Sequence, residues 1–436
     1  MNASRQVGAE SDLVQLELDD DDVAPENAVT VVPDGGYGWV VVFACSVLTF
    51  WFSGLTGAWG IIQTALLSST LTDTTTSTTA FVGSLGITIC VAFGLMAVRL
   101  MRLIGARYAA TLGISLLGIG ALASGFTTTN IAGLFQTFGV LIGAGSCLCY
   151  TASNVMPMQY FSRRLGLANA LVKLGGGLGA TVLCVSLDSL INAVGIDWMF
   201  RILGIMTLAT GIPAALAIKE RNPLPNAPIV DLALFKNIPF TAIFLAGATL
   251  VFTLFVPPFF LPLFAQSIGL SSSVGAGLVA AFSACAAIGR FVAGPLCDFI
   301  GPLNTFTIMV ALNAVTTLAI WSVSPTLPPL VAFATLNGIS NGAFFTTLPT
   351  VIVSMVDPSR AAIGMSLSIT GWTAGYLLGT PIAGYLLEAS GAVRNGYHGV
   401  DAYRPAIFYA GGLATVSSGI VLVARLVMER KLLKRV

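Results

Sequence analysis

Apolar residues follow one another in long runs over most of this chain, and polar residues gather in the short segments between the runs. A helix of about 20 residues crosses the hydrocarbon core of a bilayer. Twelve runs are of spanning length, approximately 38–62, 79–98, 108–126, 130–155, 166–192, 198–218, 238–262, 273–297, 303–322, 328–353, 361–388 and 405–427. Polar and apolar residues do not alternate within them, as they would in the strands of a membrane barrel. The pattern therefore predicts an all-α polytopic membrane protein with 12 transmembrane helices.

One polar segment near the middle of the chain, residues 219–236, contains three prolines and separates the first six runs from the last six. Proline-rich polar segments of this kind are typical of linkers. We therefore expect five parts: a disordered acidic tail (1–34), an N-terminal six-helix half (35–218), a linker (219–236), a C-terminal six-helix half (237–427) and a basic tail (428–436).

The two halves share residues at a constant spacing of 196 positions. Four identical pairs have this spacing: Gly105 and Gly301, Arg164 and Arg360, Gly175 and Gly371, and Gly179 and Gly375. Each pair occupies an equivalent place in its half, which indicates a duplication. Two six-helix repeats are an architecture of transporters that bind their substrate where the repeats meet.

Composition narrows the class of protein further. Of the 436 residues, 56% are apolar and 9% are charged, against about 25% charged in a typical soluble domain. The mean hydropathy is +0.89. A water-soluble globule could not cover its surface with so few charges, which excludes a soluble enzyme, a nucleic-acid-binding protein and a disordered scaffold. One histidine, His398, and no phosphate-binding Walker loop are present, so we expect no enzyme activity, no metal, no cofactor and no ATP.

The charges are distributed unevenly along the chain. Residues 1–34 hold nine acids and one base, Arg5, and they lack the apolar core of a presequence. Lys and Arg favour the cytoplasmic side of a membrane protein. Of the 18 bases outside the helices, 15 belong to the termini and one set of loops, and 3 belong to the opposite set. We therefore expect both termini and the linker in the cytoplasm of a multi-pass plasma-membrane protein. The seven cysteines lie in apolar runs, so no disulfide is expected.

A loop motif follows the eighth apolar run. Its core is Gly294, Asp298 and Gly301, in the spacing Gly-x-x-x-Asp-x-x-Gly. Glycines allow a tight turn, and an aspartate can cap a helix N-terminus and hold a neighbouring helix. The equivalent segment of the first half has Arg102 at the place of Asp298. That copy therefore lacks the aspartate, and an ordinary basic loop is the alternative there.

A longer string of motifs resembles one transporter family. Pro33 is followed by Asp34-Gly35-Gly36-Tyr37-Gly38-Trp39, and Tyr160-Phe161-Ser162-Arg163-Arg164 leads into the fifth run. Together with 167–169, 175–179 and 289–304, these segments resemble, in order, the fungal branch of the monocarboxylate transporter-like family of the major facilitator superfamily. The resemblance covers residues 33 to about 427. It implies two six-helix halves that rock around a central site, a small organic anion as substrate, and in most members proton coupling.

Three positions show which binding-site residues of the family are present in this chain. Arg290 matches the substrate-binding arginine that the resemblance implies. Gly57 stands where animal members have a lysine in helix one, and Ala286 stands where they have an aspartate. The resemblance therefore implies a substrate arginine but not the family's best-known proton-coupling partners.

Two cations lie deep within apolar runs. Arg290 is eight residues before Asp298, about 12 Å along a helix, and Lys173 is nine residues after Arg164, about 13–14 Å. No acid lies deep in any run. A cation at mid-membrane needs a cavity or a partner, so we expect a bound anion between them; snorkelling towards the interface is the alternative. Asn169 is one turn before Lys173, either beside the site or bonded between helices.

Other polar and aromatic residues within the runs are weaker candidates for the same site. An organic anion with an apolar body needs aromatic rings and a few amides around it. The residues that fit are Tyr150, Asn154, Asn341, Trp372 and Tyr376. Packing between helices is the alternative for each of them.

These observations predict a secondary active transporter of a small organic anion, working by alternating access in the lipid bilayer. A proton is the expected coupling ion, carried on Lys173 or on the substrate. An uncoupled facilitator and a metabolite exporter are alternatives, and so is a non-transporting membrane sensor or scaffold that uses the acidic tail. The sequence identifies no ancillary protein partner.

Overall fold

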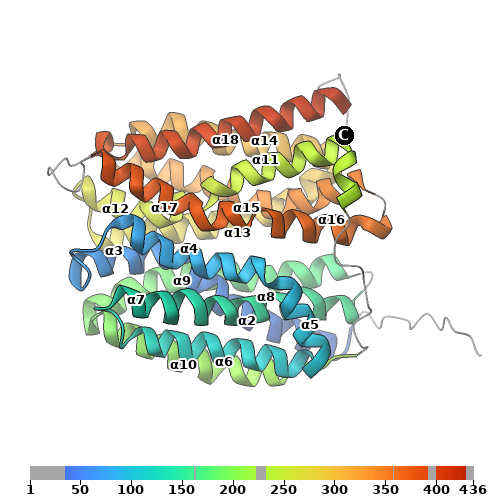
Figure 1. The fold of residues 1–436 in the computed structure, drawn as a ribbon, viewed down its shortest axis with the longest axis horizontal. Helices are drawn as coiled ribbons and strands as arrows, with labels where there is room; N and C mark the ends of the chain where they lie inside the picture. The colour runs from blue at the N-terminus through green and yellow to red at the C-terminus, as the bar shows by residue number, and fades with distance from the viewer. Residues whose placement is uncertain (1–34, 162–163, 222–231, 357, 391–398, 429–436) are drawn as a thin grey trace, which may run out of the picture. The chain divides into compact units, whose positions relative to one another are not determined.

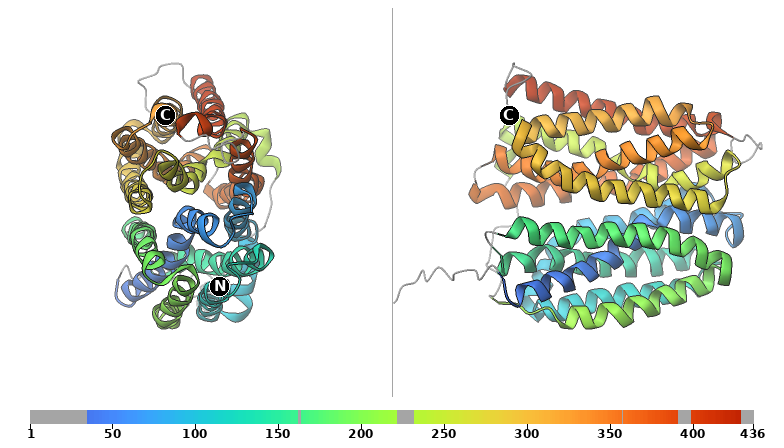
Figure 2. Two further views of the ribbon diagram at one scale, coloured as in Figure 1. Left: turned by 90° about the vertical axis from the view of Figure 1, so that its left-hand side faces the viewer. Right: turned by 180° about the vertical axis from the view of Figure 1, so that it is seen from behind.

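The computed structural model describes residues 35–161, 164–221, 232–356, 358–390 and 399–428. The predicted acidic tail, most of the predicted basic tail and the middle of the predicted linker fall outside the described residues. Within the described ranges all regular secondary structure is helical, as predicted. Figures 1 and 2 show the helices gathered into two groups that follow one another in the sequence.

The first group holds ten helical segments of the N-terminal half and one short turn. They are α2 (Gly38–Gly57), α3 (Trp59–Ser69), α4 (Thr76–Ala92), α5 (Gly94–Ile104), α6 (Ala106–Ser124), α7 (Ile131–Leu134), the π-helix η1 (Phe135–Ile142), α8 (Gly143–Val155), the short turn η2 (Met156–Gln159), α9 (Leu165–Val194) and α10 (Ile196–Leu216). The second group follows η3 (Leu232–Lys236). It comprises α11 (Ile238–Leu254), α12 (Val256–Ser267), α13 (Ser272–Ile300), α14 (Pro302–Val315), η4 (Thr316–Ile320), η5 (Trp321–Val323), α15 (Leu327–Met355), α16 (Pro358–Gly371), α17 (Thr373–Ala389) and α18 (Val400–Met428).

These segments account for the twelve predicted transmembrane runs. Nine described helices are long and apolar enough to cross a bilayer, and the pair α4 and α5, bent by 57°, makes a tenth. The long helix α15 and the consecutive helices α16 and α17 occupy the two remaining runs. The twelve-helix prediction is therefore confirmed, although four of the runs are divided, at Ala58, Phe93, Phe255 and Trp372.

The backbone supports the predicted repeat at two places. Gly105 ends α5 with φ 86° and ψ 153°, and Gly301 ends α13 with φ 96° and ψ 148°. Positive φ in this range favours glycine, which explains the identity of both residues. Ala58 and Phe255 also break their helices with nearly the same dihedrals, φ −88°, ψ −1° and φ −97°, ψ −4°. Their spacing, 255 − 58 = 197, is within one residue of the repeat.

Glycines on α9 bring that helix onto the backbone of α2. A Cβ added at Gly175 would lie 2.4 Å from the carbonyl oxygen of Ser46, and one at Gly179 would lie 2.2 Å from that of Phe50. The equivalent Gly375 meets side chains at 3.1 Å, and the comparable backbone approach, 2.2 Å to Phe252 O, occurs at Gly379. The contact is thus displaced by one turn in the second half, where α16 and α17 are interrupted at Trp372, whereas α9 is continuous.

Candidate functional site

The two predicted cations lie opposite one another where the halves meet. Helix α9 of the first half packs against α13 of the second half. The Asp188 carboxylate accepts a hydrogen bond from Ser273 Oγ at 3.0 Å, and a Cβ at Gly177 would lie 2.5 Å from the Ala287 side chain. From Gly177 to Asp188 the numbers rise on α9, while from Ala287 to Ser273 they fall on α13, so the two helices run antiparallel. The same register places Lys173 opposite Arg290. The two cations are within electrostatic range of each other.

Lys173 is held by two residues of α8. Its Nζ donates a 2.6 Å hydrogen bond to Asn154 Oδ1 and lies 5.1 Å from the centroid of the Tyr150 ring. Asn154 Nδ2 in turn donates to the Tyr150 carbonyl oxygen at 2.8 Å. A lysine ammonium has three protons to donate. The amide therefore orients the ammonium group without neutralising its charge.

Arg290 has less support from the protein. Its Cζ lies 5.5 Å from the centroid of the Phe345 ring on α15. Its Nε is buried and meets no hydrogen-bond acceptor among the described residues. Within the same ranges neither Arg290 nor Lys173 forms an ion pair with a carboxylate. An uncompensated cation at mid-membrane costs about 2.5–3.5 kcal/mol on insertion scales, so this arrangement favours a bound anion.

The surroundings of the cations are not fully packed. Lys173, Arg290, Tyr150 and Asn154 are each half-buried although all four lie within helices. Their partners place them between α8, α9, α13 and α15, away from the lipid. These side chains therefore keep some exposed surface between the helices of the two halves.

The other predicted site residues divide into two groups. Asn341 Nδ2 donates to the Leu254 carbonyl oxygen at 2.8 Å, and Trp372 Nε1 donates to the Phe244 carbonyl oxygen at 2.9 Å. Both side chains are buried, and both donate to the backbone of α11. This geometry agrees with the packing alternative for these two residues. Tyr376 is buried but within electrostatic range of Tyr150, and Asn169 is half-buried one turn before Lys173.

The entry motif joins the start of α2 to the ends of two other helices. Gly36 has φ 61°, and the Trp39 ring packs against Phe161 with centroids 4.7 Å apart. Tyr37 Oη donates to the Ala217 carbonyl oxygen at 2.8 Å, and Tyr160 Oη donates to the Lys219 carbonyl oxygen at 3.0 Å. Gly35 precedes this turn, and Asp34 lies outside the described residues. The role of the two tyrosines was not predicted from the sequence.

Of the three residues of the predicted loop motif, only Gly301 has the predicted structural role, in the turn after α13. Asp298 is exposed in the last turn of α13 and makes no hydrogen bond or ion pair with a described residue. Gly294 has open space around it. Gly301 makes the left-handed turn described above, and Arg164 precedes α9 as an exposed residue. The predicted helix N-cap is therefore not formed by Asp298, because α13 continues past this residue to Ile300.

One end of the bundle is closed by hydrogen bonds between the halves. Ser77 donates from its backbone nitrogen to Glu388 Oε1 at 2.8 Å, while Ser273 donates from its hydroxyl to Asp188 Oδ2 at 3.0 Å. Ser77 and Ser273 are 196 positions apart, which is the repeat spacing, and each meets a carboxylate of the other half. The sequence carried this signal, but it was missed. This end, at the left of Figure 1, is called the closed end below.

Further contacts between the halves lie at the closed end. Ser84 Oγ and Thr380 Oγ1 share a buried hydrogen bond. A Cβ added at Gly60 of α3 would lie 2.2 Å from the Pro258 carbonyl oxygen of α12. The opposite end carries Arg99, Arg102 and Lys236 and is called the basic end. The hydrogen bonds between the halves named above therefore seal the closed end of the bundle.

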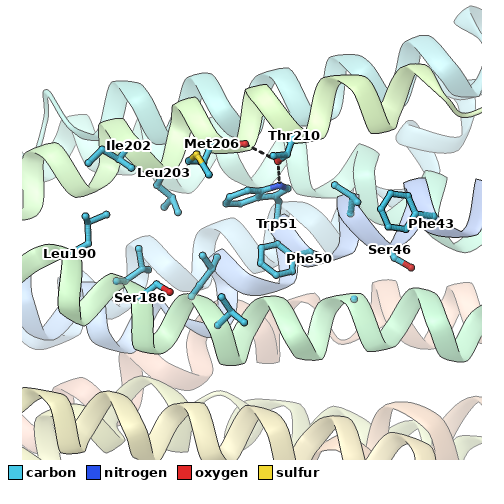
Figure 3. Close-up of a pocket in the computed structure, with 15 residues that line it drawn as sticks. Phe43, Ser46, Phe50, Trp51, Ser186, Leu190, Ile202, Leu203, Met206 and Thr210 are labelled. Carbon is cyan, nitrogen blue, oxygen red and sulfur yellow. Dashed lines mark hydrogen bonds between the residues drawn. The ribbon is translucent and has the colours of Figure 1, made fainter.

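A separate apolar cavity lies within the first half, between α2, α9 and α10 (Figure 3). Its volume is about 550 Å³. Trp51 and Thr210 line it, and Trp51 Nε1 donates a 2.8 Å hydrogen bond to Thr210 Oγ1. Phe43, one of the residues that line the cavity, is 70% exposed. Gly175, which contacts the backbone of α2, is another of the residues that line the cavity.

Comparisons with known proteins agree with this architecture. The family model described as Major Facilitator Superfamily matches residues 39–280 and 243–435. The chain is 29% identical over 401 residues to an MFS-type transporter of Ophiocordyceps sp., covering 90% of this chain and 86% of that protein. It is 26% identical over 384 residues to an aspyridones efflux protein of Emericella nidulans, covering 87% and 77%. An agnestins efflux protein of Paecilomyces divaricatus is 27% identical over 398 residues, covering 90% and 88%.

Solved structures share the fold at low sequence identity. A nucleoside transporter, NupG, superposes with a TM-score of 0.71 at 16% identity, covering 88% of this chain and 99% of that chain. A peptide transporter, POT, in complex with sulfate gives a TM-score of 0.70 at 13% identity, covering 90% and 96%. The family match extends over nearly all the described helices, and the protein is a multi-pass membrane transporter rather than an enzyme. The chain belongs to the major facilitator superfamily.

Proposed function

We propose that the chain transports a small organic anion by alternating access, as the monocarboxylate transporter-like resemblance implies. The observation that carries this proposal is the pair of facing cations, Arg290 and Lys173, without a described carboxylate partner. Arg290 binds a substrate carboxylate, because its planar fork matches two carboxylate oxygens. Lys173 supplies the second positive contact. The basic end faces the cytoplasm of a plasma-membrane protein, so the conformation described here is closed to the outside.

At two positions this chain differs from the monocarboxylate transporter-like family in residues that concern proton coupling. Gly57, at the place of the family's lysine, packs against α9, and a Cβ there would lie 3.0 Å from the Ala180 Cβ. Ala286, at the place of the aspartate, is buried against α15. The second cation of this site therefore comes from α9 instead of helix one. In this proposal the coupling proton travels on Lys173 or on the substrate.

Export is the direction that one observation favours. Two of the relatives are named as efflux proteins, for aspyridones and for agnestins. The alignments with them cover most of both chains. We therefore include export of an organic acid as the second form of the proposal, with the same two cations as the binding site.

Transport by purified protein in liposomes tests the proposal. Labelled organic acids are offered with and without a pH gradient, in both directions. Arg290→Ala should insert normally and lose transport, and Arg290→Lys should recover little. The control is Arg404→Ala, because Arg404 lies exposed beside Asp401 at 2.9 Å, outside the site. Transport by Arg290→Ala at the parental rate, at equal protein content, would overturn the assignment.

A further inference from the structure

The fixed charges around the site do not balance. Lys173 and Arg290 contribute two positive charges that face each other across the interface between α9 and α13. The nearest described acid along α9 is Asp188, 15 residues away, or about 22 Å of helix. The nearest along α13 is Asp298, eight residues away, or about 12 Å. A ligand with one negative charge would therefore leave one of the two cations without compensation.

Each cation has donors left for a ligand. Asn154 takes one proton of the Lys173 ammonium, which leaves two. The Arg290 guanidinium makes no hydrogen bond to a described residue, and its Nε is buried without an acceptor. Buried donors without acceptors are rare in folded proteins. Both groups are therefore free to bind separate anionic groups of one ligand.

The aromatic neighbours define what lies between the charges. Tyr150 flanks Lys173, and Phe345 flanks Arg290. The two rings come from α8 and α15, the fourth and tenth transmembrane segments, so each half supplies one cation and one ring. A ligand that spans the site meets a positive group of each half at its ends and the two rings alongside.

We infer that the preferred substrate is a small organic dianion, such as a dicarboxylate, with one acidic group on Arg290 and the other on Lys173. This inference rests on the proposed function, because it assumes that an organic anion is transported. It adds the number of acidic groups and their separate partners. A dianion also joins the two halves, because its two ends are held by different halves of the protein.

The test compares acids that share a carbon skeleton. Purified full-length protein in liposomes is offered labelled succinate, its half-amide succinamate, and butyrate at pH 7.5, where the carboxylates are ionised. A charge-assisted hydrogen bond to the second carboxylate should favour succinate by about tenfold or more over the half-amide. Lys173→Gln should lower succinate transport more than transport of the two monoacids, and should therefore remove this preference. Lys173→Arg should keep the preference, because the positive charge remains.

The outcomes of this test distinguish the dianion inference from the proposed anion transport. Equal transport of succinate and succinamate by the parent, unchanged in Lys173→Gln, would overturn the dianion inference and leave anion transport standing. Transport of butyrate that requires chloride would also overturn it, because an inorganic anion would then neutralise Lys173. Transport of none of the acids would count against the proposed function itself. If Lys173→Gln does not fold, the thermal stability of the parent in detergent decides, since succinate should raise it more than succinamate.

Discussion

The contact between α3 and α12 allows the closed end to be opened by one substitution. A Cβ added at Gly60 would lie 2.2 Å from the Pro258 carbonyl oxygen and 2.9 Å from that of Phe259. Both contacts are with backbone, which cannot rotate away as a flexible side chain can. Gly60→Val should therefore force α3 and α12 apart. The strain arises only while the closed end is closed, because α3 and α12 belong to different halves.

The size of the effect follows from the cost of overpacking. Inserting extra methyl groups into a packed contact costs about 1–3 kcal/mol. If this cost falls entirely on the closed conformation, the population of the conformation open at this end rises by about 5- to 150-fold. Transport should then fall, because a transporter must close each end in turn. The folded protein itself should persist.

Labelling of a buried cysteine measures the shift. Ser84 is fully buried at the closed end, so Ser84→Cys in a background without the seven native cysteines reports its opening. A membrane-impermeant maleimide applied from the side of the closed end should modify this cysteine faster in Gly60→Val than in the parent background. Gly277→Val on α13 is the matched control, because no atom lies within 4 Å of a Cβ added there. An unchanged labelling rate in Gly60→Val, with the protein folded, would refute the reasoning.

Two further changes test the packing and the tail. Gly175→Leu should lower thermal stability or stop transport, because a Cβ there would lie 2.4 Å from the Ser46 carbonyl oxygen, whereas Gly412→Leu on α18 should do neither, since nothing lies within 4 Å. Size-exclusion chromatography after heating compares the two, and equal tolerance would contradict the packing role of Gly175. Deleting residues 1–30 should leave insertion and transport per molecule unchanged, because that segment has little apolar surface to bury; surface labelling and uptake measure both, and a loss of either would show that the tail packs.

The transmembrane segments and the repeat could be predicted because each depends on a signal that is local in the sequence. Apolar runs of spanning length cross a bilayer in helical form whatever they contact. The 196-residue spacing is visible without any coordinates. The break at Phe255 is indicated in the sequence, because Pro257 and Pro258 follow it and prolines kink or end a helix. The break at Ala58 could not be predicted, because Ala58 is an ordinary apolar residue with no proline beside it.

The candidate site could be predicted in part. Lys173 and Arg290 are conspicuous because deep cations are rare in apolar helices, but their facing arrangement depends on the register between α9 and α13. Asn341 was proposed for the site, yet it donates to a carbonyl oxygen near the break in the seventh transmembrane segment. A polar side chain inside a membrane helix can serve a ligand or a broken backbone, and the sequence does not distinguish these uses.

The matched breaks at Ala58 and Phe255 give the molecule a pair of hinges. Beyond each hinge lies a short arm, α3 with 11 residues and α12 with 12, and the two arms touch each other at Gly60 and Pro258. Rotation about these two breaks would move the arms relative to α2 and α11. A local swing of the arms would part Gly60 from Pro258, whereas the hydrogen bonds of Ser77 to Glu388 and of Ser273 to Asp188 lie on other helices and break only when the halves separate. Lys173 and Arg290 lie on the unbroken helices α9 and α13, so bending at the two breaks would leave the spacing of the two cations unchanged.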